Sequence, residues 1–198
     1  MRTLKYAILG LISREPMTGY DITREFNSNS LANFWYAKHS QVYPELSRLT
    51  EEGLATCQVV IRGKRLEAKL YTITDKGRAE LLEWLMECDE VPPTPKDVFR
   101  LRVYFSDLMT RQELRGHLQD QLEKHRRKCR YLTDIMEKLY NSSAPPVGTA
   151  ACGDFMVLEG AVLRENAYIQ WLVNCISRIP DESSETADEA GADTVSPK

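Results

Sequence analysis

The stretch from residue 34 to residue 54 constrains the fold of this chain more than any other segment. Three aliphatic residues recur there at spacings of four and then three, which predicts one buried helix face: Val42, Leu46 and Leu49. The opposite face carries small or neutral polar groups beside cations: Lys38, His39, Ser40, Gln41, Tyr43, Pro44 and Ser47. Such a helix can rest on a core and present its polar face to a groove, although an ordinary amphipathic helix with a solvated face has the same pattern.

Both ends of this helix can be placed from the sequence. Pro44 lacks a backbone N–H and is tolerated in or near the first turn, so the helix is expected to begin near Ser40. Gly53 is expected to end it, because glycine adopts the left-handed conformation of a C-terminal cap without steric cost. The positive end of the helix dipole then lies beside residues 38–41, which is a natural place for a phosphate.

Two shorter helices are predicted before it. The first has an apolar side made of Leu4, Ala7, Ile8 and Leu11. It stops around residues 13–16, and a second helix begins at Thr18, whose hydroxyl can cap it while Asp21 favours its positive end. Ile22 and Phe26 form the inward face of this second helix. Three helices within about fifty residues are typical of a helix-turn-helix arrangement.

A β-hairpin is predicted directly after the third helix. Residues 54–61 are rich in β-branched side chains, and residues 68–74 alternate between two faces. The turn between them carries three cations, Arg62, Lys64 and Arg65. A charged hairpin tip can simply be solvated, but here it follows a candidate recognition helix. The combination predicts a winged helix-turn-helix, in which one helix enters the major groove and the wing reaches phosphates or the minor groove.

The second half of the chain is predicted to be helical. A fourth helix begins at Thr74 or Asp75, with an apolar stripe formed by Leu81, Leu82, Leu85 and Met86. The proline-rich stretch that follows is stiff and extended, which marks a domain boundary. We therefore predict a mainly α protein with a small β-hairpin, divided into a winged helix-turn-helix domain (1–90), a linker (91–97), a helical dimerisation and effector domain (98–180) and a disordered acidic tail (181–198).

Two long helices with apolar seams dominate the predicted C-terminal domain. The first begins at a capping box made by Thr110 and Glu113. The seams are typical of an antiparallel helix pair, completed by the same pair from another subunit. The residues predicted at the dimer interface are Leu118, Leu122, Leu132, Leu158, Val162, Ile169 and Leu172. Each seam also holds one ionisable residue, His125 in the first and Glu165 in the second. These two either meet each other, a partner such as Arg164, a trapped water or a ligand, or they extend to solvent at the seam edge.

Composition narrows the class of protein. A net charge of −3 gives no global basic signal, so any nucleic-acid contact must come from a local patch. The chain lacks a long apolar span and a signal-peptide pattern, so we expect a cytoplasmic protein with no membrane partner. Five widely spaced cysteines argue against zinc or a disulfide framework. No glycine-rich phosphate loop, metal-spaced cluster or nucleophile motif is present, so we expect neither an enzyme nor a cofactor.

Several segments resemble the PadR family of winged-helix transcriptional regulators, in its branch with a long C-terminal domain. These segments are residues 4–11, 19–23, 37–46, 70–74 and 163–168, and the resemblance covers nearly everything except the acidic tail. It implies a homodimer that binds an inverted-repeat DNA operator and represses a phenolic acid decarboxylase gene. It further implies that a hydroxycinnamic acid such as p-coumarate or ferulate binds between the two domains and releases the DNA.

The resemblance also implies which residues contact DNA. That role carries to Tyr20, Lys38, His39, Ser40, Gln41, Tyr43 and Lys64. Charge adds Arg62 and Arg65, and the polar helix face adds Ser47. A rival reading within the same class is a repressor of an efflux transporter that senses lipophilic drugs.

A phenolic effector needs a cation for its carboxylate and an apolar slot for its ring. The candidate cations are Arg100, Lys128 and Arg164. The candidate ring partners are Phe99, Tyr131, Tyr168 and Trp171, and Glu165 is a candidate polar contact. Each of these residues can instead be an ordinary core aromatic or part of a surface ion pair.

Overall fold

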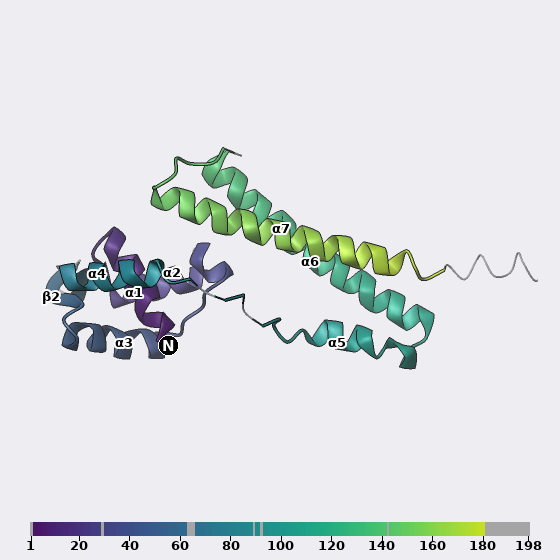
Figure 1. Ribbon diagram of the computed structural model, residues 1–198, viewed down its shortest axis with the longest axis horizontal. Coiled ribbons are helices and arrows are strands. Elements are labelled where there is room, and N and C mark those ends of the chain that lie inside the picture. Colours follow the sequence, from purple (N-terminus) through teal and green to yellow (C-terminus); the bar gives the residue numbers. More distant parts are fainter. Residues whose placement is uncertain are drawn as a thin grey trace, which may run out of the picture. The chain divides into compact units, whose positions relative to one another are not determined.

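The computed structural model describes residues 2–28, 30–62, 66–88, 90–91, 93–141 and 143–180 (Figure 1). The predictions for Lys64, for Arg65 and for the acidic tail 181–198 lie outside these residues, as does the side chain of Arg62. The chain forms two units. The winged-helix unit comprises Met1–Pro93 with Gly148–Asp154, and the helical unit comprises Thr94–Val147 with Phe155–Lys198.

The winged-helix unit contains the predicted three helices, hairpin and fourth helix. Its elements are α1 (Thr3–Arg14), β1 (Met17–Thr18), α2 (Gly19–Ser28), the 3-10 helix η1 (Ser30–Asn33), α3 (His39–Glu51), β2 (Ala55–Arg62), β3 (Leu66–Ile73) and α4 (Asp75–Leu85). The strands form an antiparallel sheet in the order β1-β3-β2. The two-residue strand β1 was not predicted; it exists because Met17 and Thr18 pair with Tyr71 and Leu70 of β3.

The core of this unit is mostly aliphatic, and α1, α2 and α3 supply most of its fully buried side chains. Its fully buried side chains are Ile8, Leu9, Ile12, Ile22, Phe26, Val42, Leu46, Leu49 and Leu54. The predicted inward faces of the second and third helices are therefore confirmed. Burial of Val42, Leu46 and Leu49 in this core stabilises α3. The opposite face of the helix can therefore carry polar groups.

The ends of α3 follow the predicted chemistry, with one shift. The helix begins at His39, so Pro44 is its sixth residue and lies in the second turn. Gly53 has φ +71°, and its N–H donates to the Thr50 carbonyl while the Leu54 N–H donates to the Leu49 carbonyl. This pair of bonds is a Schellman motif, which stops the helix and turns the chain into β2.

The apolar stripe predicted for α4 is only partly buried. Thr74 caps the helix by accepting a hydrogen bond from the Gly77 N–H at 3.0 Å, and Leu81 is buried. Leu82, Leu85 and Met86, by contrast, are 61 to 78% exposed, so most of the predicted stripe faces solvent. Helical spacing identifies an apolar face, but it does not say whether another element covers that face.

The helical unit contains α5 (Val98–Tyr104), the 3-10 helix η2 (Ser106–Leu108), α6 (Arg111–Tyr140) and, from Phe155 on, α7 (Ala150–Ile176). The Thr110 capping box of α6 is confirmed: the Glu113 N–H donates to the Thr110 hydroxyl at 3.2 Å, and the Thr110 N–H donates to the Glu113 carboxylate at 2.9 Å. Contacts between α6 and α7 run in opposite directions along the chain, from Arg115 against Ile179 to Tyr140 against Phe155, so the pair is antiparallel.

Candidate nucleic-acid interface and ligand site

One exposed face of α3 carries the predicted DNA-contacting residues of the third helix. All six are exposed: Lys38, His39, Ser40, Gln41, Tyr43 and Ser47. The Lys38 backbone N–H donates to the Gln41 side-chain oxygen at 2.9 Å, which fixes the first turn of the helix. The arrangement presents hydrogen-bonding groups and a cation at the positive end of a helix dipole, as phosphate and base-edge contacts require.

Tyr43 is the largest group on this face, and its ring is held on two sides. The His39 ring lies 4.3 Å from it, tilted by 34°. On α2, the backbone of Gly19 comes so close that a Cβ there would lie 2.8 Å from the Tyr43 Cζ. Tyr43 is 37% exposed, and Tyr20 in the first turn of α2 is 66% exposed. Both side chains are thus partly accessible to solvent.

The N-terminus of α2 is anchored by the predicted pair of side chains. The Thr18 hydroxyl donates to the Asp21 carboxylate at 2.7 Å, and the Asp21 N–H donates back to the Thr18 oxygen at 3.2 Å. Both residues are buried. The capping predicted for Thr18 and Asp21 is therefore present, and it fixes the position of Tyr20.

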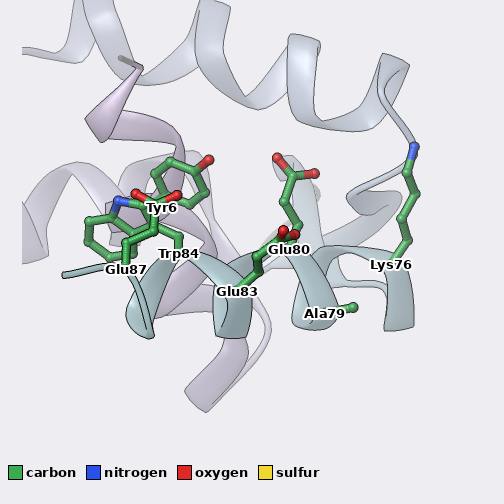
Figure 2. A pocket seen from close by; sticks show the side chains of 7 residues that line it. All are labelled: Tyr6, Lys76, Ala79, Glu80, Glu83, Trp84 and Glu87. Atoms are coloured by element: carbon green, nitrogen blue, oxygen red, sulfur yellow. The ribbon is translucent and has the colours of Figure 1, made fainter.

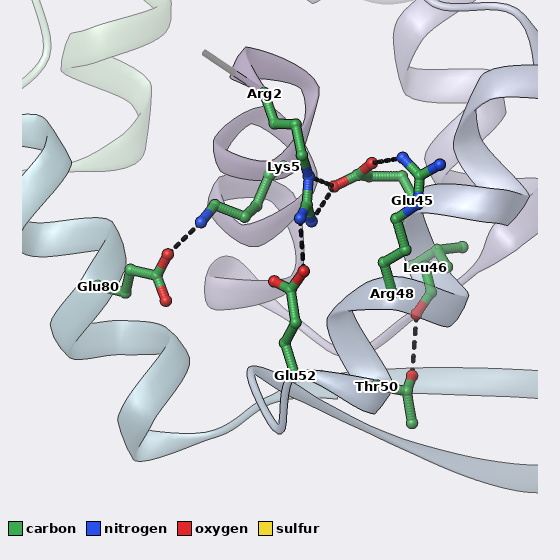
Figure 3. Close-up of polar contacts among 8 residues, drawn as sticks. All are labelled: Arg2, Lys5, Glu45, Leu46, Arg48, Thr50, Glu52 and Glu80. Atoms are coloured by element: carbon green, nitrogen blue, oxygen red, sulfur yellow. Dashed lines mark hydrogen bonds and ion pairs between the residues drawn. The ribbon is translucent and has the colours of Figure 1, made fainter.

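A buried carboxylate holds the inner side of α3 (Figure 3). Glu45 is 5% exposed, and it accepts hydrogen bonds from Arg2 at 2.7 and 3.0 Å and from Arg48 at 3.3 Å. Arg2 also donates to Glu52 at 2.5 Å. Hydrogen bonds from Arg2 lower the pKa of Glu52, and those to Glu52 and Glu45 raise the pKa of Arg2. The start of α1 is thus tied to both the middle and the end of α3.

A hollow between α1 and α4 lies in the same unit (Figure 2). It is lined by Tyr6, Lys76, Ala79, Glu80, Glu83, Trp84 and Glu87. The Tyr6 and Trp84 rings stack there at 4.6 Å and 2°. Lys5 pairs with Glu80, and Lys76 donates to the Glu52 carbonyl at 2.8 Å. None of the predicted site residues lines this hollow, whose stacked rings join α1 to α4.

In the helical unit, four of the predicted effector residues form one cluster. Trp171 makes edge-to-face contacts with Phe99 at 6.2 Å and with Tyr168 at 5.0 Å. The Arg100 guanidinium lies over the rings of Tyr168 at 5.3 Å and Trp171 at 5.7 Å. Asp97 completes the cluster: it accepts the Tyr168 hydroxyl at 2.9 Å and pairs with Arg100 at 3.3 Å.

Glu165 extends this cluster along the seam between α6 and α7. It is 7% exposed and lies 2.6 Å from the Lys128 ammonium and 2.5 Å from the His125 ring nitrogen. The His125 ring in turn stacks on Tyr168 at 4.0 Å. Of the alternatives that the sequence left open for His125 and Glu165, the structure thus shows that they meet each other.

The carboxylates of this cluster are held ionised. Burial opposes ionisation of Glu165, but hydrogen bonds from Lys128 and His125 outweigh it and lower its pKa. Burial likewise opposes ionisation of Asp97, while hydrogen bonds from the Arg100 N–H and the Tyr168 hydroxyl lower its pKa. Burial, followed by the hydrogen bond to Asp97, raises the pKa of Tyr168 to about 12. The phenol therefore stays a hydrogen-bond donor at neutral pH.

Two predicted effector residues lie elsewhere. Tyr131 on α6 and Arg164 on α7 are both exposed, and they take no part in the ring contacts and ion pairs above. Conversely, Asp97 belongs to the cluster but was placed in the linker. Its signal was local, because an aspartate three residues before Arg100 can cap the start of α5, and it accepts the Arg100 N–H at 3.0 Å.

The residues predicted at the dimer interface pack within one chain. Leu118, Leu122 and Leu172 form one buried cluster, to which Ile169 adds, and Leu132 and Leu158 form another, to which Val162 adds. Their contact with a partner subunit stays a prediction. Large apolar side chains that remain accessible on the same helices include Tyr131, Leu139, Met156, Val157 and Leu163.

The described residues contain neither a cluster of metal-binding side chains nor a membrane-spanning helix. No group of three or more metal-binding side chains comes together in the described ranges. None of the helices in the part of the chain that the structure describes is long and apolar enough to cross a membrane.

Two family models match the chain. Residues 8–83 match the model of the transcriptional regulator PadR-like family, and residues 95–179 match the model named virulence activator alpha C-term. The negative transcriptional regulator PadR of Bacillus subtilis is 44% identical over 180 residues, which cover 90% of this chain and 98% of that protein. That relative is a transcriptional regulator, which is the class of protein that the sequence predicted for this chain.

Solved structures of the same relative agree with the fold. The crystal structure of Bacillus subtilis PadR in complex with operator DNA matches with a TM-score of 0.85 and 42% identity, covering 90% of this chain and all of that chain. The structure of that protein with p-coumaric acid matches with a TM-score of 0.79 and 42% identity, covering 91% and 97%. The predicted winged-helix fold with a C-terminal helical region is confirmed, and the chain belongs to the PadR-like family of transcriptional regulators.

Proposed function

We propose that this protein is a homodimeric DNA-binding repressor of phenolic acid stress genes, such as a phenolic acid decarboxylase gene. A phenolic acid effector would release it from an inverted-repeat operator. The observation that carries this proposal is the exposed face of α3, which displays Lys38, Gln41 and Tyr43 on a helix anchored from behind by buried side chains. The operator-bound relative, 42% identical, supports the same use of the fold.

The α3 face offers separate residues for phosphate contacts and for base contacts. Lys38 at the helix N-terminus is placed to meet a phosphate, where the dipole and its charge act together. Gln41 and Tyr43 follow within the first two turns, where a recognition helix contacts base edges. The wing residues Arg62, Lys64 and Arg65 add phosphate contacts by their charge. In a symmetric dimer, two such helices would read half-sites roughly 34–36 Å apart.

The cluster around Trp171 supports an effector with an aromatic ring and a carboxylate. Phe99, Tyr168 and Trp171 supply ring contacts, and Arg100 supplies a cation. Because Arg100 is already paired with Asp97, an effector carboxylate would take over that ion pair rather than fill an empty one. Such an exchange would free Asp97 and change what holds the start of α5, which gives ligand binding a structural consequence.

Dimerisation is assigned to the helical unit. Since the seam between α6 and α7 is filled within one chain, the partner would meet the side chains that remain exposed on these helices, such as Leu139, Met156 and Leu163. An antiparallel helix pair with accessible apolar groups is a common element of subunit interfaces.

The test is a titration of the full-length protein on its own upstream DNA by gel shift and fluorescence anisotropy. We expect a shifted band that excess nonspecific duplex does not remove, and we expect p-coumarate to abolish it. Arg100→Ala should retain the band but need much more p-coumarate, whereas exposed Arg164→Ala should respond as the parent does. A band unchanged by millimolar p-coumarate or ferulate would contradict the effector class and favour a lipophile-sensing repressor of an efflux transporter.

A further inference from the structure

Gly19, the first residue of α2, is a glycine in a position where its backbone does not require one. Its φ lies outside the left-handed region, so an L-amino acid could adopt the same conformation. Glycine is also a poor helix former, since it loses more conformational entropy on folding than alanine does. The reason for glycine at this position must therefore come from its neighbours.

The neighbour is the side chain of Tyr43. A Cβ added to Gly19 would lie 2.8 Å from Cζ, 2.9 Å from Cε1 and 3.1 Å from the hydroxyl oxygen of Tyr43. These distances are shorter than van der Waals contact, so the phenol end of the ring rests directly on the backbone of α2. Gly77 differs, because a Cβ there would meet the backbone oxygen of Leu54 at 2.2 Å, which cannot move aside.

The α2 backbone around Gly19 is rigid, whereas the Tyr43 ring can move. Thr18 is paired with Leu70 in the sheet and bonded to Asp21, so the backbone on both sides of Gly19 is fixed. Tyr43 is 37% exposed and can rotate about its side-chain torsions toward solvent. A methyl group at position 19 would therefore displace the ring rather than the helix, and the ring would also leave its contact with His39.

We infer that Gly19 is a positioning residue of the DNA-reading surface: the absence of a side chain there lets the α2 backbone hold the Tyr43 phenol at a fixed angle on the α3 face. This inference rests on the proposed function, because it assigns Gly19 a role through Tyr43 and the operator. It makes operator recognition depend on α2 as well as on α3, although Gly19 itself is buried.

The variant that tests it is Gly19→Ala, with Gly10→Ala as the matched control. Gly10 lies within α1, and a Cβ there would meet nothing within 4 Å. Both variants should melt at the parent's temperature or above it, because alanine favours helix. Gly19→Ala should weaken operator binding about tenfold, on the scale of one lost base contact, while Gly10→Ala should bind as the parent does. Equal affinity of Gly19→Ala and the parent, with Tyr43→Ala weakened, would overturn the inference and leave the proposed function standing.

Two further measurements separate the ring from other causes. Adding Gly19→Ala to Tyr43→Ala should weaken operator binding no further, because the ring that the methyl group would displace is already absent. Independent losses that multiply would contradict the inference. In the free protein, NMR signals of the His39 ring should shift in Gly19→Ala while those of His117 and His125 stay in place. An unchanged His39 signal would overturn the inference whether or not the protein binds DNA.

Discussion

Among single residues, Glu45 is a charged side chain buried beneath the exposed face of α3. Its carboxylate accepts hydrogen bonds from Arg2, which also binds Glu52 at the end of the helix (Figure 3). The two acceptors differ in environment, because the Glu45 side chain is 6% exposed and that of Glu52 is 36% exposed. One arginine thus provides a matched comparison of a buried and an accessible ion pair.

We predict that Glu45→Gln lowers the free energy of unfolding by about 1–2 kcal/mol, because the buried acceptor of the Arg2 and Arg48 hydrogen bonds loses its charge. Glu52→Gln should cost less, about 0.5 kcal/mol, since water replaces the bond and screens the charge. Urea titrations of both variants and the parent, followed by circular dichroism, measure the difference. Equal losses of unfolding free energy in the two variants would show that burial of Glu45 does not strengthen its ion pair with Arg2.

This part of the site could not be predicted from the sequence. Glu45 is adjacent to the exposed Pro44 in a polar stretch, and its partner Arg2 is 43 residues away. By contrast, the exposed positions of α3 followed from the spacing of Val42, Leu46 and Leu49 alone. The spacing of apolar residues identifies the buried and exposed faces of a helix. Ion pairs between residues far apart in the sequence, such as Arg2 and Glu45, depend on tertiary packing.

At the scale of elements, the antiparallel helices α6 and α7 share a buried carboxylate. Glu165 on α7 is bound by Lys128 and His125 of α6, and its pKa is lowered. A lowered pKa in the folded state means that unfolding takes up protons in acid. The stabilisation by Glu165 is therefore complete above the ordinary pKa of 4.5 and is lost as the pH falls through the lower, folded value.

We predict that Glu165→Gln destabilises the protein by about 1–2 kcal/mol at neutral pH and by progressively less below about pH 4.5. Glu159→Gln, at an exposed position of the same helix, should show no such pH dependence. Urea unfolding of the three proteins across this pH range provides the measurement. A difference between parent and Glu165→Gln that stays constant in acid would exclude Glu165 as its source.

The elements themselves were predictable where capping and period agree. Thr110 with Glu113, and Gly53 at the end of α3, behaved as their local chemistry requires. The strand β1 was missed because two residues carry no period and form a strand only through β3. Joining Asp97 to Tyr168 likewise needs a fold that brings together residues 71 positions apart.

For the whole molecule, the proposed homodimer requires a surface that joins two copies. The seam leucines that the sequence assigned to the dimer are buried between α6 and α7 of one chain, because a heptad seam has the same pattern whether its partner helix is internal or external. The apolar residues left exposed on α7 are therefore the better candidates. Leu163 is 62% exposed, and Leu82 on α4 of the winged-helix unit is a close match at 61%.

We predict that Leu163→Glu weakens the dimer about ten- to a hundredfold, since burying a leucine contributes about 1.5–3 kcal/mol and a charge cannot replace it. Leu82→Glu should leave the dimer intact. Sedimentation equilibrium measures the association, and anisotropy with full and half operators measures its consequence: the parent should prefer the full site strongly, and Leu163→Glu should bind both alike. If Leu163→Glu remained dimeric while Leu82→Glu dissociated, the subunits would be joined through the winged-helix unit instead.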